Sequence, residues 1–321
     1  MELTARSANE ALANGIRYLL FAGEAETSRN GDVLACPEPV LIKYLDPCNR
    51  VLRSPTRDAN PFFHLAEALW MLSGRNDLAF LQKFVSTFDA YSDDGVTLHG
   101  AYGHRWRKHF GRDQLHDIAG ELQKNPNSRR AVLGMWNPAA DLPMLLSGGR
   151  DVPCNTQAYF DLRGGKLNMT VTNRSNDALF GCFGANLVHF SILQEFMAAW
   201  LGAPVGEYRQ FTNNLHVYTS VFSREKLERI CLESDLAPSS RSLPLVSIGV
   251  WDWQQELDLL LNGEIVMLDD PFLRDTATPM LEAWRMRKRG APADEVLSEL
   301  EQVMSADWRC AATEWVSRRQ K

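Results

Sequence analysis

The sequence contains few of the features that mark membrane, secreted or nucleic-acid-binding proteins. Among its 321 residues, no apolar run reaches the roughly 18 residues that a membrane-spanning helix needs. The N-terminal stretch MELTARSANEALANG has no basic segment followed by an apolar core, so we expect no signal peptide. A net charge of −6 argues against general affinity for nucleic acid or for an anionic membrane surface. We therefore expect a cytoplasmic protein that binds neither nucleic acid nor membrane.

The patterns of metal-binding, disulfide-bonded and dinucleotide-binding proteins are also missing. The six cysteines are scattered, with no CxxC pair and no zinc-ligand spacing, which predicts reduced thiols and no metal. The segment GCFGAN is one glycine short of a dinucleotide fingerprint and does not follow the required strand and turn. Internal repeats, low-complexity segments and clear linkers are absent. A single α/β domain over residues 1–321 is therefore predicted, and its length allows a large core.

A β-hairpin over residues 151–175 is the clearest local pattern in the chain. Apolar and polar residues alternate on both sides of two adjacent glycines, which is a hairpin-turn signal. If the strands pair in simple register, Cys154 and Arg174 lie at the same end. A guanidinium beside a thiol lowers the pKa of the thiol and makes it a nucleophile. This pair is the first candidate for a catalytic site.

Two other segments carry charged residues whose meaning the local sequence leaves open. Asn60 is a good N-cap and Pro61 suits a first helical position, so PFFHLAEALWMLSG is predicted to be a helix. Glu67 within it is either on the solvated side or a buried acid, and by itself the solvated position is the commoner one. The pair Arg129-Arg130 precedes the predicted strand AVLGMW, and such a pair is usually a solvated surface feature.

The second half of the chain is predicted to alternate helices and strands. A long apolar helix from about residue 187 to 201 is expected at the centre of the core. Residues 205–218 are predicted to form one strand, with His216 and Tyr218 on the same face. After residue 222 the segment PLVSIGVW is predicted to be a short strand, and two amphipathic helices end the chain.

Taken together, several segments resemble the thymidylate synthase family. They are NPFFHLAEALWMLSG, GAYGHRWR, NPNSRRAVLGMWN, DVPCN, the strand ending in NRSND, and NNLHVY. They occur in the family's order and at about its spacing, and residues past about 225 match less clearly. The closest similarity is to the phage-type branch, which includes hydroxymethylases of pyrimidine nucleotides and whose members would act in the host cytoplasm. The resemblance implies an α/β (α+β) fold, a large mixed sheet packed with helices, and a homodimer formed through a sheet face.

The resemblance also implies catalytic roles. Cys154 would add to C6 of a pyrimidine ring, which makes C5 nucleophilic and splits a difficult step into easier ones. Glu67 would be a buried acid that organises proton transfers, and Tyr102 would help to remove the proton at C5. Asp177 would act with them and would hold the folate, which is expected to be 5,10-methylenetetrahydrofolate. Phe88 would belong to the folate-binding site.

The substrate nucleotide would lie among basic and polar side chains. Arg174 and Ser175 would bind its 5′-phosphate, and Arg29 would reach in from a turn. Arg129 and Arg130 would come from the partner subunit of the dimer. Several arginines around one dianion suit bidentate, charge-assisted recognition. The base and the sugar would be bound by the remaining matched residues, Asn186, His216 and Tyr218.

Four departures from the family pattern bear on the product. Asn155 follows the cysteine where the synthases usually carry histidine. Phe88 stands where a tryptophan tied to the hydride-transfer stage is usual. The chain ends in ATEWVSRRQK, without the short apolar tail that closes over the synthase site. The segment SNDALFGCFGAN is one residue longer than usual, so Asn186 matches the base-reading asparagine with the insertion and Ala185 matches it without.

The first three departures weaken the case for methyl transfer, in which the folate also donates a hydride. They suit an enzyme in which water quenches the methylene intermediate and gives a 5-hydroxymethyl product, because a closed, dry site protects such intermediates. Hydroxymethylation of dUMP is the leading hypothesis, since the Asn186 amide suits uracil whereas relatives acting on cytosine often carry aspartate. The alternatives are a thymidylate synthase proper, a dCMP methylase or hydroxymethylase, and, in another class, an inactive nucleotide-binding homologue.

Overall fold

Two mixed β-sheets form the centre of the computed structural model, which describes residues 1–233, 242–264 and 267–320. The larger sheet has the order β1 (Glu2–Ala5), β4 (Val40–Tyr44), β9 (Val205–Thr212), β7 (Lys166–Asn173), β6 (Asn155–Arg163) and β5 (Val132–Gly134). The smaller one has the order β2 (Glu24–Ser28), β3 (Gly31–Ala35), β10 (Leu215–Tyr218) and β8 (Asn176–Asp177). In the larger sheet β7 pairs in parallel with β9 and antiparallel with β6. The predicted fold class, a large mixed sheet with helices, is confirmed.

The predicted hairpin is formed by β6 and β7. Its turn consists of Gly164 and Gly165 at φ of 57° and 73°, values that two-residue hairpin turns require and that glycine adopts without strain. The alternate apolar residues of both strands are buried, as the sequence pattern predicts, except Leu162 near the turn, which is partly buried. The backbone N–H of Arg174 donates to the carbonyl oxygen of Cys154 at 2.9 Å. Cys154 and Arg174 therefore lie at the same end of the hairpin, as predicted, although a bulge between Asn155 and Gln157 interrupts the simple register.

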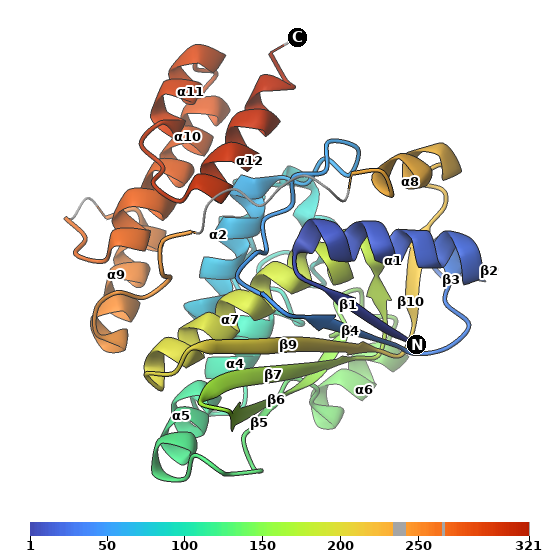
Figure 1. The fold of residues 1–321 in the computed structure, drawn as a ribbon, viewed down its shortest axis with the longest axis horizontal. Helices are drawn as coiled ribbons and strands as arrows, with labels where there is room; N and C mark the ends of the chain where they lie inside the picture. Colours follow the sequence, from blue (N-terminus) through green and yellow to red (C-terminus); the bar gives the residue numbers. More distant parts are fainter. Residues whose placement is uncertain (234–241, 265–266, 321) are drawn as a thin grey trace.

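Helices cover one face of the larger sheet in two layers (Figure 1). α7 (Asn186–Trp200) packs on β7 and β9, and α2 (Pro61–Leu72) packs on α7. The side chain of Asn60 caps α2 by accepting hydrogen bonds from the first free N–H groups, as predicted. Because α2 lies between α7 and the C-terminal helices, nearly all of its residues are buried.

The other helical segments surround these layers. In chain order they are α1 (Ala8–Ala22), α3 (Leu78–Gln82), the 3-10 helix η1 (Ser86–Tyr91), α4 (Tyr102–Arg107), α5 (Gln114–Lys124), α6 (Pro138–Leu146), the π-helical η2 (Ala178–Ala185), α8 (Arg224–Ile230), α9 (Val250–Asn262), the π-helical η3 (Leu273–Ala277), α10 (Thr278–Lys288), α11 (Ala293–Leu300) and α12 (Ala306–Ser317). In the described part of the chain, no helix has the length and apolarity to cross a membrane.

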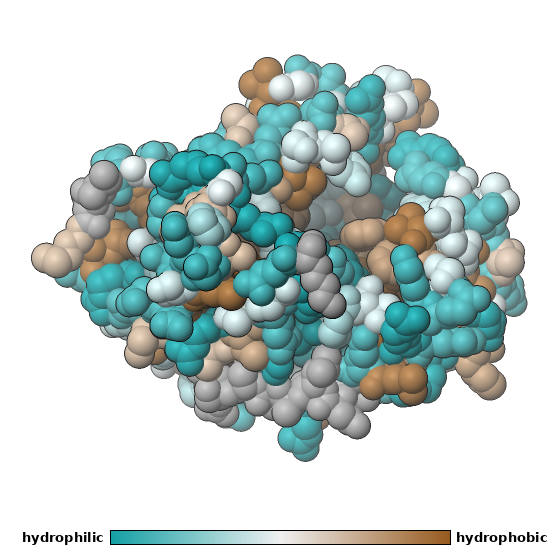
Figure 2. Space-filling view, turned by 90° about the horizontal axis from the view of Figure 1, so that it is seen from above, coloured by the Kyte–Doolittle hydropathy of each residue, from teal (hydrophilic) through white to brown (hydrophobic). Residues whose placement is uncertain are grey.

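The C-terminal helices α10 and α12 pack against the outer side of α2, and α11 packs on both of them (Figure 1). The ring of Phe62 in α2 lies 5.5 Å from Trp284 and 5.7 Å from Trp315. These aromatic contacts join the segment that resembles the family least to the helix that carries Glu67. Figure 2 shows hydrophilic side chains over most of the upper face, with hydrophobic ones gathered around a hollow.

Two predicted strands differ in the structure. Residues 205–218 form not one strand but two, β9 and β10, which belong to different sheets and are separated at Asn213 and Asn214. The segment PLVSIGVW is not a strand. Its backbone is held by two carboxylates, since Leu245 N–H donates to Glu195 and Ser247 N–H donates to Asp270. Side-chain acceptors there replace the neighbouring strand that the apolar alternation suggests.

Candidate active site

The segment that carries Cys154 is held from two sides. The backbone N–H groups of Cys154 and Asn155 both donate to the hydroxyl oxygen of Tyr102, at 3.0 and 3.1 Å. Arg174 donates from Nε and Nη2 to the carbonyl oxygens one and two positions before Cys154, at 2.8 and 2.9 Å. The strand register slips directly after Asn155, and such bulges are common beside active sites. The thiol therefore sits on a fixed backbone beside a guanidinium.

The electrostatics of the thiol differ from the prediction. Burial raises the pKa of Cys154, and the neighbouring carboxylate of Asp151 adds to the effect. Arg174 and Arg29 lower the pKa, but burial and Asp151 together outweigh them, so the pKa of the thiol is raised. The expectation that the arginine makes this thiol acidic is thus wrong for the isolated chain. Burial and the Asp151 carboxylate together destabilise the thiolate by more than the guanidinium groups stabilise it.

A basic pocket of about 370 Å³ lies on one side of the Cys154 segment. Five of the predicted substrate-binding residues line it: Arg29, Arg174, Ser175, His216 and Tyr218. The rings of His216 and Tyr218 lie edge to face with their centres 5.1 Å apart, so they share a face as predicted. Arg150 also lines the pocket. Sequence reasoning missed it, although its position four residues before Cys154 was a usable signal.

An aromatic pocket of about 500 Å³ lies on the other side of the same segment. Phe88 lines it, and its ring lies 5.6 Å from that of Phe63 and 5.4 Å from that of Tyr91. Glu67 and Tyr102 face the same space. A large apolar wall with a few polar groups is typical of a site for a flat organic ligand.

Glu67 is a buried acid, not a solvated one. Its side chain is buried in α2, and its Oε2 lies 2.9 Å from Nε2 of His189 in α7. His64, one turn before Glu67, lines the aromatic pocket as well. Burial, helped by Arg57 and His189, lowers the pKa of His64 to about 3, so this imidazole is neutral. The two histidines were missed because each stands alone within an apolar helix.

Asp177 joins the smaller sheet to η2 and caps that helix. Its Oδ1 accepts the N–H of Phe180, whereas its buried Oδ2 has no hydrogen-bond partner among the described residues. Burial raises the pKa of Asp177 despite that hydrogen bond. Asp177 lines a third pocket, which also contains Phe180, Arg29 and Tyr218 and so adjoins the other two. A buried acceptor without a partner points to a ligand that carries N–H donors.

A network of buried amides surrounds Asn186. Asn155 donates from Nδ2 to Oδ1 of Asn186 at 3.3 Å, and Asn186 donates from Nδ2 to Oδ1 of Asn176 at 3.0 Å. Asn173 donates to Asn155, and Thr212 donates to Asn173. The unusual residue after the cysteine is therefore the direct partner of Asn186. Ala185, the other candidate for that position, lines the aromatic pocket instead.

Arg129 and Arg130 do not approach Cys154 of their own chain. Both are exposed, and Arg130 pairs with Glu121 at 2.8 Å on the outside of α5. Neither lines the basic, aromatic or third pocket. Within one chain, the structure thus gathers all the predicted site residues except this pair.

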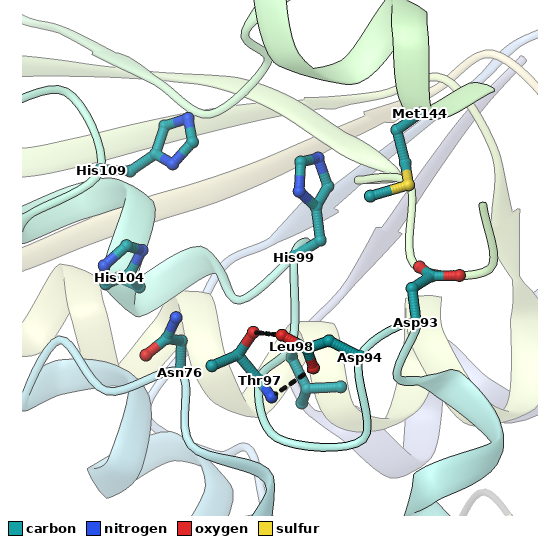
Figure 3. Close-up of a pocket in the computed structure, with 9 residues that line it drawn as sticks. All are labelled: Asn76, Asp93, Asp94, Thr97, Leu98, His99, His104, His109 and Met144. Carbon is teal, nitrogen blue, oxygen red and sulfur yellow. Dashed lines mark hydrogen bonds between the residues drawn. The ribbon is translucent and has the colours of Figure 1, made fainter. Parts of the chain in front are cut away.

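A buried ion pair fixes the helix α4, which begins with Tyr102. Arg105 donates from both Nη atoms to the two carboxylate oxygens of Asp141, at 2.9 and 2.7 Å, and both side chains are fully buried. His99 Nε2 lies 2.7 Å from Asp141 Oδ1. Figure 3 shows His99 in a small pocket with His104 and His109. In the described part of the chain, no three His, Cys, Asp or Glu side chains are arranged to hold a metal ion.

The comparison with known proteins agrees with this geometry. The pattern of the thymidylate synthase family matches residues 55–250, which include Cys154, Glu67 and most of the side chains described above. The chain therefore belongs to the thymidylate synthase family.

Three relatives come from phages. The chain is 44% identical to the deoxyuridylate hydroxymethyltransferase of Pseudomonas phage M6, over 98% of this chain and 93% of that protein. It is 39% identical to the deoxyuridylate hydroxymethyltransferase of Bacillus phage SP01, over 78% of this chain and 72% of that protein. The enzyme of the same name from Delftia phage PhiW-14 is 31% identical over 64% of this chain and 60% of that protein.

Proposed function

We propose that the chain transfers a one-carbon unit from 5,10-methylenetetrahydrofolate to C5 of dUMP and releases 5-hydroxymethyl-dUMP. The main support is that the segment before Cys154 borders two chemically different pockets. Arg150 and Val152 line the basic pocket, whereas Asp151 between them lines the aromatic one. A nucleophile between an anion site and an apolar site suits a reaction that joins a nucleotide to a folate. The relatives named deoxyuridylate hydroxymethyltransferases favour this substrate and product.

The basic pocket would hold the nucleotide. Arg29 and Arg174 supply planar groups that can bind phosphate oxygens in pairs, and Ser175 adds a hydroxyl. The nearby rings of His216 and Tyr218 would bind the sugar hydroxyl. The guanidinium of Arg174 would serve twice, because it also holds the backbone of the nucleophile through the two carbonyl oxygens before Cys154.

Cys154 would attack C6 of the ring as a thiolate. Because burial keeps the pKa of this thiol high, ionisation depends on Arg174 and Arg29, which oppose that effect. Addition at C6 gives C5 the character of an enolate carbon, which can then bond to the one-carbon unit. The hydroxyl oxygen of Tyr102 accepts two N–H groups of the Cys154 segment, so its own O–H remains free to donate to the group that removes the proton at C5.

The aromatic and third pockets would hold the folate. Phe88 and Phe180 offer flat apolar walls, and the unpartnered Oδ2 of Asp177 suits the N–H donors of a pterin ring. Glu67, whose Oε2 lies 2.9 Å from Nε2 of His189, would pass protons between the ring and the one-carbon unit.

The amide of Asn186 would read the base. Oδ1 already accepts one hydrogen bond and Nδ2 already donates one, which leaves one lone pair and one N–H. The free lone pair of Oδ1 matches the N3–H donor of uracil, and the free N–H of Nδ2 matches its O4 acceptor. Cytosine presents an acceptor and a donor at those positions, so it would fit only if the amide flipped. Asn155 and Asn176 oppose such a flip, because the donor of Asn155 needs the oxygen of the Asn186 amide and the acceptor of Asn176 needs its nitrogen.

Assays with dUMP and dCMP test this function. With methylenetetrahydrofolate and dUMP we expect a nucleotide heavier by one CH2O unit, together with tetrahydrofolate, detected by mass spectrometry. We expect dCMP to react far more slowly because of the orientation of Asn186. Release of dihydrofolate with a methyl product would indicate a thymidylate synthase, preferential turnover of dCMP would indicate a cytosine enzyme, and the absence of any product would indicate an inactive homologue.

The enzyme would act as a homodimer. The larger sheet carries Val132, Tyr159 and Phe211 on the face opposite α7, and each of these apolar side chains is 40% exposed. β5, β6 and β9 thus each expose one apolar side chain on a face that a second copy of the sheet would cover. Arg129 and Arg130 lie at the start of β5, at the edge of this face, where they could reach the basic pocket of a partner.

Subunit mixing tests the contribution of the partner. Cys154→Ser alone and the double change Arg129→Ala with Arg130→Ala should each give inactive dimers. A hybrid of the two has one site with both a cysteine and the partner's arginines. Unfolding and refolding an equal mixture should therefore restore about a quarter of the wild-type activity, since half the dimers are hybrids with one intact site. If the mixture stays inactive although hybrids form, the arginines act within their own subunit.

A further inference from the structure

The aromatic pocket contains a carboxylate that the roles above leave unused. Asp151 lines this pocket together with Glu67 and Tyr102. Its Oδ2 accepts the N–H of Gly100 at 2.7 Å, and its side chain is only partly buried, so it remains open to the cavity. A Cβ atom at position 100 would lie 2.6 Å from Oδ1 of Asp151, so the close approach of this carboxylate depends on glycine there.

The backbone on either side fixes the direction of this carboxylate. Asp93 accepts hydrogen bonds from the N–H of Arg150, at 3.0 Å, and from the N–H of Asp151, at 3.4 Å. Asp93 itself faces the small pocket of Figure 3, away from the aromatic pocket. Hydrogen bonds of Asp93 and Asp151 thus fix the segment before Cys154, but only Asp151 faces the aromatic pocket.

A negative charge at this place opposes the first step of the reaction. Asp151 raises the pKa of the Cys154 thiol, which makes the nucleophile harder to form. An apolar side chain at position 151 could line the aromatic pocket without raising the pKa of the thiol. Burial also raises the pKa of Asp151 itself, which makes its ionised form a stronger base than a surface aspartate. These properties suit a group that acts after the thiolate has been consumed.

We propose that Asp151 is the general base that activates water in the final stage of the reaction, an inference that rests on the proposed function. At that stage C6 carries Cys154 Sγ and C5 carries an exocyclic methylene. Asp151 takes one proton from a water molecule while the water oxygen bonds to the methylene carbon. The π electrons of the methylene double bond move towards C4, which forms an enolate at O4.

Collapse of the enolate completes the step. The C4 carbonyl and the C5–C6 double bond form again as the C6–S bond breaks, and Cys154 leaves with the electron pair as a thiolate. The nucleotide gains a hydroxymethyl group, and the proton from water remains on Asp151 until it passes to solvent. No oxidant or reductant is consumed, in contrast to methyl formation, which needs a hydride.

The variant Asp151→Asn tests this role, because an amide oxygen can still accept the N–H of Gly100 but is not a base. We expect formation of 5-hydroxymethyl-dUMP to fall by about 10²–10³-fold, within the range for loss of a general base. In a single turnover with enzyme in excess, release of tritium from dUMP labelled at C5, which reports the earlier steps, should stay close to the wild-type rate. The covalent methylene adduct should then accumulate, and added 2-mercaptoethanol should trap it as a thioether visible by mass spectrometry.

Asp93→Asn is the matched control, since it removes a charge that holds the same segment but lies outside the aromatic pocket. Both rates should remain near those of the wild type, and both variants should unfold at the wild-type temperature. Equal losses of single-turnover tritium release and hydroxymethyl formation in Asp151→Asn, or no loss of either, would overturn the inference. Wild-type protein that forms no hydroxymethyl product would instead overturn the proposed function, and the inference with it.

Discussion

Replacing Cys154 with serine is expected to lower the rate of 5-hydroxymethyl-dUMP formation by about 10³–10⁶-fold, the range seen when a covalent nucleophile is removed. A serine hydroxyl is far less ionised than a thiol, and the two guanidinium groups that assist ionisation cannot close that gap. Binding of dUMP should change little, because Arg29, Arg174 and Ser175 line the basic pocket independently of the sulfur. Turnover, calorimetric binding of dUMP, and mass spectrometry of the denatured protein for a covalent adduct together measure the effect.

Cys310→Ser provides the control for this change. Cys310 is half-buried in α12, with its Sγ 3.6 Å from Oε1 of Glu314, and it lines none of the three pockets. We expect its replacement to leave turnover and adduct formation unchanged. If Cys154→Ser kept a substantial part of the wild-type rate, Cys154 would not be the nucleophile, and the site would have to be placed elsewhere.

Replacing Asp141 with alanine is expected to lower the free energy of unfolding by about 3–5 kcal/mol, the cost of breaking a buried ion pair from one side. Both partners of the pair are fully buried, so the variant would leave the Arg105 guanidinium without its carboxylate in the core. Urea denaturation followed by fluorescence measures the change. Activity should fall too, because Arg105 belongs to α4, the helix that begins with Tyr102.

Asp117→Ala is a suitable comparison, since Asp117 pairs with Arg112 at the surface and salt and water screen such a pair. Its loss should destabilise the protein far less.

The contribution of Asp141 to the free energy of unfolding should also depend on pH. Burial alone would raise the pKa of Asp141, but hydrogen bonds from Arg105 and Asn137 outweigh it and hold the pKa below its usual value. The stabilisation is therefore present above the unfolded carboxyl pKa and is lost as the pH falls through the lower folded value. Equal losses in the two variants would contradict the buried-pair interpretation.

The local elements of the active site followed from the sequence alone. Alternation and paired glycines defined the hairpin, and Asn60 with Pro61 defined the start of α2, because turns and caps depend on neighbouring residues. The family resemblance then selected Cys154, Glu67 and Asp177 by motif. A large mixed sheet could be expected from that resemblance, but neither the number of its strands nor their order, which depend on pairings between distant segments.

The tertiary structure decided the properties that depend on surroundings. The sequence placed an arginine beside Cys154 and suggested an acidic thiol, but burial, which depends on the whole fold, reverses the direction of the pKa shift. It left Asn186 and Ala185 as alternatives, and the amide network places the asparagine in contact with Asn155. The different pockets of Arg150 and Asp151 were equally invisible, because the sequence does not show which cavity lies on each side of this segment. Sequence thus determined which reactive groups are present, and folding determined how far each group is exposed to solvent, which partners it contacts and which cavity it faces.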